Sequence, residues 1–137
     1  MVSATTIRST LPTRGSTVTT FSRYAVALAL AASSALKVSS GPLPSQLLPP
    51  IGHYSVSAAE MLIALVLFWH VGDRAVRISL VGAMIVAAAG MILPLMSTAS
   101  CGCFGSHIVL SPHQHLLVAG SLGVFAWLAY PSERSHP

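Results

Sequence analysis

Four apolar runs limit the folds open to this chain, and they cover residues 24–38, 54–71, 76–96 and 113–130. A helix needs about 20 residues to cross the hydrocarbon core of a bilayer, and about 17 suffice where the bilayer is thin. The last three runs reach or nearly reach this length, and the first has about 18 residues when Phe21 and Ser22 are included. Charged residues make up 7% of the chain, far below the share of about 25% in soluble domains. The sequence therefore predicts an all-α integral membrane four-helix bundle.

One membrane domain is expected over residues 23–131, with helices at about 22–38, 55–72, 75–96 and 113–130. Residues 1–22 are rich in Ser and Thr and are expected to form a disordered cytoplasmic tail, and residues 132–137 form a second tail. The basic tail and the short first run also fit a secretory signal, with the small residues at 32–35 as its cleavage site.

The start of the second helix has its own signals. Ser57, followed three residues later by Glu60, resembles a capping box, which would begin the helix at Ser57; the apolar run alone begins it one turn earlier, at Tyr54. Pro49 and Pro50 argue against a continuous helix before that point.

The arginines predict the orientation, because basic residues near helix ends stay on the cytoplasmic side. Every arginine falls on one side of a four-helix topology: Arg8, Arg14, Arg23, Arg74, Arg77 and Arg134. Both termini are therefore expected in the cytoplasm, and the loops at residues 39–53 and 97–112 on the outer face. The net charge of +4 then reflects topology. Nucleic acid is not an expected partner, because the chain has no soluble basic domain to bind it.

Both cysteines of the chain, Cys101 and Cys103, lie in the second outer loop with only Gly102 between them. Alternate residues of an extended segment point the same way, and glycine permits the turn that brings two sulfurs together. A disulfide that closes three residues stabilises a protein by about 1.6 kcal/mol before strain, against about 3 kcal/mol for a fifteen-residue loop. Such a bond has little structural value, and strained, exposed disulfides exchange readily. The spacing in an oxidising compartment therefore favours a redox pair.

A metal site is the alternative interpretation of the same loop, with Cys101, Cys103, His107, His113 and His115 as ligands. Thiolates and imidazoles suit zinc or copper. The Cys-x-Cys spacing with scattered histidines matches none of the compact zinc motifs. On a helix, His113 and His115 would diverge by about 200°. Unpaired or purely structural cysteines remain a third interpretation.

Glu60 is an acid inside an apolar run, where a carboxylate is costly and normally faces a partner or water. Lys37, at the outer end of the first helix, is the cation nearest to its depth. We expect a Lys37–Glu60 ion pair, with a proton relay from Glu60 to the cysteine loop as the alternative.

The motif Cys101-Gly102-Cys103-Phe104-Gly105 after the third helix resembles the methylamine utilisation protein MauE family, which is related to the DoxX-like membrane proteins. The similarity covers roughly residues 24–130 and extends to Lys37, to Glu60 and to Ser111-Pro112. It implies that the first helix is retained and that Cys101 and Cys103 act as the redox pair. It also implies a thioredoxin-like periplasmic partner and a role in the maturation of periplasmic methylamine dehydrogenase or another exported client.

The sequence thus predicts a multi-pass protein of the bacterial inner membrane that acts as a redox carrier or assembly factor. Phe104 is expected to pack the loop against the bilayer interface, and Gly105 to form the turn that follows. No cofactor is predicted, because the chain lacks the second dithiol that commonly transfers electrons to one. A non-catalytic membrane subunit or a metal-handling protein is the competing prediction. Small residues at helical spacing in the last two helices favour tight packing within one chain, with a homodimer as the alternative.

Overall fold

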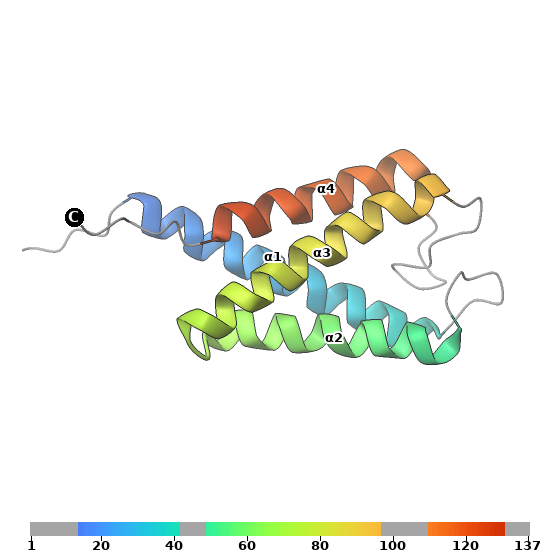
Figure 1. The fold of residues 1–137 in the computed structure, drawn as a ribbon, viewed down its shortest axis with the longest axis horizontal. Helices are drawn as coiled ribbons and strands as arrows, with labels where there is room; N and C mark the ends of the chain where they lie inside the picture. Colours follow the sequence, from blue (N-terminus) through green and yellow to red (C-terminus); the bar gives the residue numbers. More distant parts are fainter. Residues whose placement is uncertain (1–13, 42–48, 97–109, 131–137) are drawn as a thin grey trace, which may run out of the picture.

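The computed structural model describes residues 14–41, 49–96 and 110–130. In these residues all regular structure is helical, and it forms four helices (Figure 1): α1 (Arg14–Ser40), α2 (Pro50–Trp69), α3 (Asp73–Met96) and α4 (Pro112–Ala129). The predicted all-α fold with four helices is therefore confirmed. The cysteine motif and His107 lie outside the described residues.

Successive helices run in opposite directions, and α1 packs chiefly against α2 while α3 packs chiefly against α4 (Figure 1). This topology gives the bundle two distinct ends. We call one the loop end, where α1 and α3 finish and α2 and α4 begin. The other is the turn end, where α1 begins, α2 turns into α3 and α4 finishes. The connection that carries both cysteines is attached to the loop end, between Met96 and Pro112.

Two helix starts differ from those predicted. Helix α1 begins at Arg14 rather than near residue 22, so residues 14–22, which were expected to be disordered, are helical. Helix α2 begins at Pro50 rather than at Ser57, because proline suits the first helical position, where its missing N–H is not needed. The capping-box interpretation of Ser57 is wrong, since its hydroxyl donates to the carbonyl of His53 at 3.0 Å within the helix.

Specific capping interactions define the end of α2 and the start of α4. His70 ends α2 in the left-handed region at φ 48°, and Gly72 at φ 144° allows the reversal into α3. Ser111 and Gln114 form a capping box at the start of α4, in which Ser111 Oγ accepts from the Gln114 N–H at 3.4 Å and Gln114 Oε1 accepts from the Ser111 N–H at 3.0 Å. The position at which the cysteine connection rejoins the bundle is therefore well defined.

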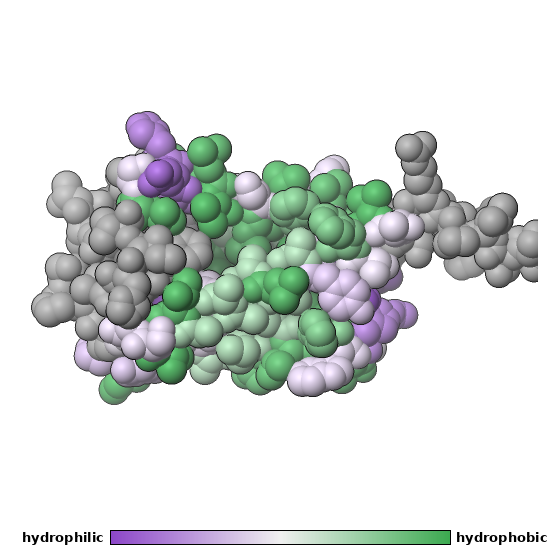
Figure 2. Space-filling view, turned by 180° about the vertical axis from the view of Figure 1, so that it is seen from behind, coloured by the Kyte–Doolittle hydropathy of each residue, from purple (hydrophilic) through white to green (hydrophobic). Residues whose placement is uncertain are grey.

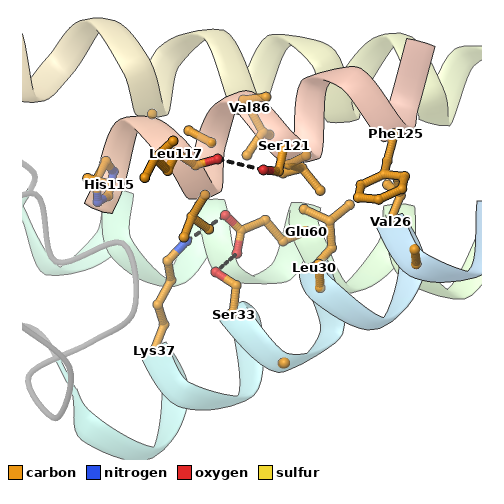
Figure 3. A pocket seen from close by; sticks show the side chains of 18 residues that line it. Val26, Leu30, Ser33, Lys37, Glu60, Val86, His115, Leu117, Ser121 and Phe125 are labelled. Carbon is orange, nitrogen blue, oxygen red and sulfur yellow. Dashed lines mark hydrogen bonds and ion pairs between the residues drawn. The ribbon is translucent and has the colours of Figure 1, made fainter. Parts of the chain in front are cut away.

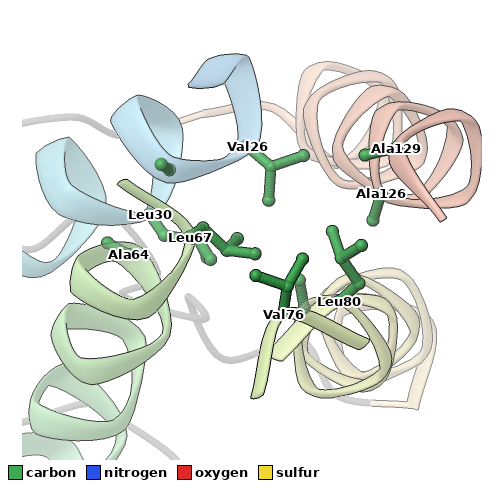
Figure 4. Close-up of a cluster of buried hydrophobic side chains, with 10 residues drawn as sticks. Val26, Leu30, Ala64, Leu67, Val76, Leu80, Ala126 and Ala129 are labelled. Carbon is green, nitrogen blue, oxygen red and sulfur yellow. The ribbon is translucent and has the colours of Figure 1, made fainter. Parts of the chain in front are cut away.

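The hydrophobic core joins all four helices towards the turn end (Figure 4). Its labelled members are Val26, Leu30, Ala64, Leu67, Val76, Leu80, Ala126 and Ala129. Several are alanines, and small side chains let helices approach closely. This packing leaves larger apolar side chains on the outside of the bundle.

The outer surface is strongly apolar over its middle, with hydrophilic residues towards both ends of the face in Figure 2. Leu117 is 71% exposed, Trp127 68% and Ile78 65%. Among the described residues, two helical segments are long and apolar enough to cross a membrane, Pro50–Trp69 and Asp73–Ile92. Large exposed apolar areas are typical of protein surfaces that contact lipid or a partner.

Candidate functional site

A buried ion pair joins α1 and α2 (Figure 3). Lys37 Nζ lies 2.5 Å from Glu60 Oε1, and both side chains are buried, with 5% and 3% of the residue exposed. This confirms the predicted Lys37–Glu60 pair. Removing one partner of a buried pair typically costs about 3–5 kcal/mol, because the other charge remains buried and unpaired.

Hydrogen bonds extend the pair into a polar seam between α1 and α2. Ser33 Oγ donates to Glu60 Oε2 at 3.2 Å, and Ser34 Oγ donates to the Ser57 carbonyl at 2.8 Å. His53 Nε2 lies 3.2 Å from the Lys37 carbonyl oxygen. Both oxygens of the Glu60 carboxylate therefore have partners, which buried charges require.

Helical spacing explains why these residues meet. Ser33 and Lys37 are one turn apart on α1, and His53, Ser57 and Glu60 follow one another at intervals of three or four residues on α2. Such spacings place side chains on one helix face. The two polar faces pack against each other. Of the residues in this seam, only Lys37 and Glu60 were predicted from the sequence to pair. The periodic recurrence of Ser and His around these two charges was the signal for the rest of the seam.

A cavity of about 470 Å³ lies beside the ion pair, chiefly between α1 and α4 (Figure 3). Its polar end is formed by Ser33, Lys37, Glu60 and His115. Its other walls are almost entirely apolar and come from α1, α3 and α4. The combination of apolar walls with a few convergent polar groups is the usual composition of a small-molecule site.

His115 comes from the first turns of α4 and is 8% exposed. Gly90 on α3 lies beside it, since a Cβ built at residue 90 would be 3.9 Å from His115 Nε2 and 3.4 Å from the Ala119 Cβ, which are ordinary contact distances. His113, by contrast, is exposed. The predicted divergence of the two histidines on a helix is therefore confirmed.

The described residues contain no cluster of side chains that would support the metal-site interpretation. Within residues 14–41, 49–96 and 110–130, no group of three or more His, Cys, Asp or Glu side chains could hold a metal ion. Of the histidines proposed as ligands, only His113 and His115 fall in this part of the chain.

A second polar group lies at the turn end. Arg23 Nη1 is 2.6 Å from His70 Nδ1, and His70 Nε2 is 3.3 Å from Asp73 Oδ1. The Arg23 guanidinium also lies 5.0 Å from the centroid of the Tyr24 ring. This group ties the first half of α1, at Arg23, to the α2–α3 turn, a contact that was not predicted from the sequence.

No family model, curated protein or solved structure matches this chain.

Proposed function

We propose that this chain is a multi-pass protein of the bacterial inner membrane that assists thiol–disulfide exchange, or the maturation of an exported client, through Cys101 and Cys103. The observation that carries the proposal is the placement of the cysteines relative to the arginines. The connection with both cysteines is attached to the loop end of the bundle. The arginines of the described helices belong to the opposite end: Arg14, Arg23, Arg74 and Arg77.

This separation supports an orientation with the turn end in the cytoplasm, because basic residues are retained on that side. The cysteines then face an oxidising compartment, where disulfides form and persist. The apolar exterior of the bundle supports the membrane location, and all four helices would cross the bilayer or nearly so. Both termini would be cytoplasmic.

The chemistry is a thiol–disulfide exchange that needs no cofactor within the chain. A thiolate of the partner attacks one sulfur of the Cys101–Cys103 disulfide, the S–S bond breaks, and the other cysteine leaves as a thiolate. A second thiolate of the partner then attacks the mixed disulfide. The partner becomes the disulfide, the Cys101/Cys103 pair becomes the dithiol, and two electrons have moved from the partner to this chain. The reverse sequence reduces the partner.

The Lys37–Glu60 pair lies in the half of the bundle to which the cysteine connection is attached. Lys37 lies near the end of α1, and Glu60 is held by Lys37 and Ser33. Because both carboxylate oxygens have partners, the geometry favours a structural role for Glu60 over a proton relay. The pair joins α1 to α2 at the half of the bundle that carries the cysteine connection.

The resemblance to the MauE family indicates the class of partner. The Cys101-Gly102-Cys103-Phe104-Gly105 motif, together with Lys37 and Glu60, is similar to the pattern of that family. A thioredoxin-like periplasmic protein, or a disulfide-containing exported client, is therefore the partner that we propose.

Thiol trapping in intact cells tests the proposal. Cys101→Ser and Cys103→Ser are expressed separately, and cells are quenched with acid before disulfide-linked complexes are separated. At least one single variant is expected to accumulate a mixed disulfide with an exported protein, because the resolving thiol is missing. The double Cys101→Ser/Cys103→Ser variant is the control and should form none. Unchanged client maturation and no trapped complex in either single variant would refute the redox function, and stoichiometric metal retained through purification would favour the metal-handling alternative.

A further inference from the structure

The cavity beside the ion pair is long and has chemically different ends. Along α1 its wall runs from Ala25 to Lys37, a distance of about 18 Å at the rise of an α-helix. His115, Lys37 and Glu60 gather at one end in Figure 3, and Val26 and Phe125 lie at the other. A molecule that fills this space would need a small polar head and an apolar tail.

The cavity opens along one side of the bundle. Ala29 and Ala32 of α1 line it and are exposed, as are Leu117 and Val118 of α4. If the helices lie in a membrane, this opening faces the acyl chains. The ligand would therefore enter from the bilayer rather than from water.

The polar end carries no net formal charge from its ion pair. The Lys37 ammonium has three N–H bonds, and among the described residues its one hydrogen-bond partner is Glu60. It can therefore donate a further bond into the cavity. A phosphate group would meet the Glu60 carboxylate as well as the ammonium, so an anionic headgroup is disfavoured. An uncharged headgroup with a carbonyl oxygen accepts the bond without this repulsion.

We infer that the cavity binds an uncharged, lipid-soluble molecule whose carbonyl-bearing headgroup accepts a hydrogen bond from Lys37 and whose apolar tail lies between α1 and α4. Membrane quinones belong to this chemical class. The size of the cavity, about 470 Å³, falls in the range of about 300–1,000 Å³ found for small-molecule sites. The inference rests on the proposed membrane location and is independent of the cysteine chemistry.

The test uses the full-length protein in lipid nanodiscs, with decylubiquinone as the probe and isothermal titration as the measurement. Decyl phosphate has an apolar chain of the same length and an anionic head, so it tests the selectivity of the polar end. Ala29→Leu and Ala32→Leu place additional atoms in the wall of the cavity. Ala35→Leu is the matched control, because Ala35 is exposed on the same helix and does not line the cavity.

Decylubiquinone is expected to bind saturably to the wild-type protein, and each blocking variant should weaken binding by about tenfold or more. Ala35→Leu should leave the affinity unchanged, and decyl phosphate should not compete. Absence of saturable binding to the wild type would overturn the inference, as would equal competition by decyl phosphate or equal affinity in all three variants. Binding is measured without any thiol assay. A negative result here therefore leaves the cysteine function standing, and a negative trapping result leaves this site standing.

Discussion

Lys37 and Glu60 meet across α1 and α2, with Nζ 2.5 Å from Oε1 and both side chains buried. They are the only Lys and the only Glu among the described residues. Their contact joins the last turns of α1 to the middle of α2, and both residues belong to the polar seam and to the wall of the cavity.

Glu60→Gln should destabilise the bundle by about 3–5 kcal/mol, because the Lys37 ammonium would remain buried without a counter-charge. Unfolding in detergent, followed by circular dichroism, measures the change. The double variant Lys37→Met/Glu60→Leu should recover much of the loss, since apolar side chains often replace a buried pair without a penalty. A stable Glu60→Gln protein that has lost thiol exchange would instead support the proton relay.

Asp73→Asn is the control for that experiment. Asp73 has a side chain that is 87% exposed, and its contact with His70 is a surface interaction. Its removal should change the free energy of unfolding by about 0–1 kcal/mol.

Ser33→Ala should weaken the seam without breaking the ion pair. It removes the hydroxyl that donates to Glu60 Oε2 at 3.2 Å, and hydrogen bonds to charged groups contribute about 1.5–3 kcal/mol. Ser39→Ala, at an exposed position on the same helix, should change stability by less than about 0.5 kcal/mol. Equal effects of the two substitutions would show that the Ser33 bond adds nothing to stability.

Gly90 should tolerate alanine and reject leucine. A Cβ at this position would lie at ordinary contact distances from Ala119 and His115, and alanine favours a helix over glycine by about 0.5–1 kcal/mol. Gly90→Leu would press α3 away from α4 and should cost about 1–3 kcal/mol. Thermal unfolding of both variants measures this contrast, and equal stabilities would argue against close packing at residue 90.

The proposed orientation can be checked with single cysteines in the Cys101→Ser/Cys103→Ser background. Ile51 is 82% exposed near the loop end, and Val71 is 69% exposed at the turn end. Ile51→Cys should react with a membrane-impermeant maleimide in intact cells, whereas Val71→Cys should react only after permeabilisation. The opposite pattern would place the native cysteines in the cytosol and exclude the proposed chemistry.

Sequence reasoning predicted the number of helices, because the apolar runs are long and separated by Pro, Gly or charged residues. It also predicted the Lys37–Glu60 contact, since an acid in an apolar helix requires a partner and one cation lay at a similar depth. It placed the start of α2 wrongly, because Ser57 has the residue type of a cap but bonds back to His53 inside the helix.

Other features depend on tertiary structure that no local pattern contains. The contact between Arg23 and His70 joins residues far apart in the sequence, and it requires the first half of α1 to lie beside the α2–α3 turn. The cavity depends in the same way on how α4 approaches α1. Ser33 could have been predicted as a member of the seam, because it lies one helical turn before Lys37 and therefore on the same face of α1.

The polar seam determines how α1 and α2 are aligned along their length. Between apolar helices in lipid there is little hydrophobic force to choose one alignment over another. A slide of α1 by a single helical turn, about 5.4 Å, would still place apolar side chains against α2, but it would separate the ammonium of Lys37 from the carboxylate of Glu60. The Lys37–Glu60 pair therefore fixes the register of α1 against α2, which apolar packing alone would leave weakly determined.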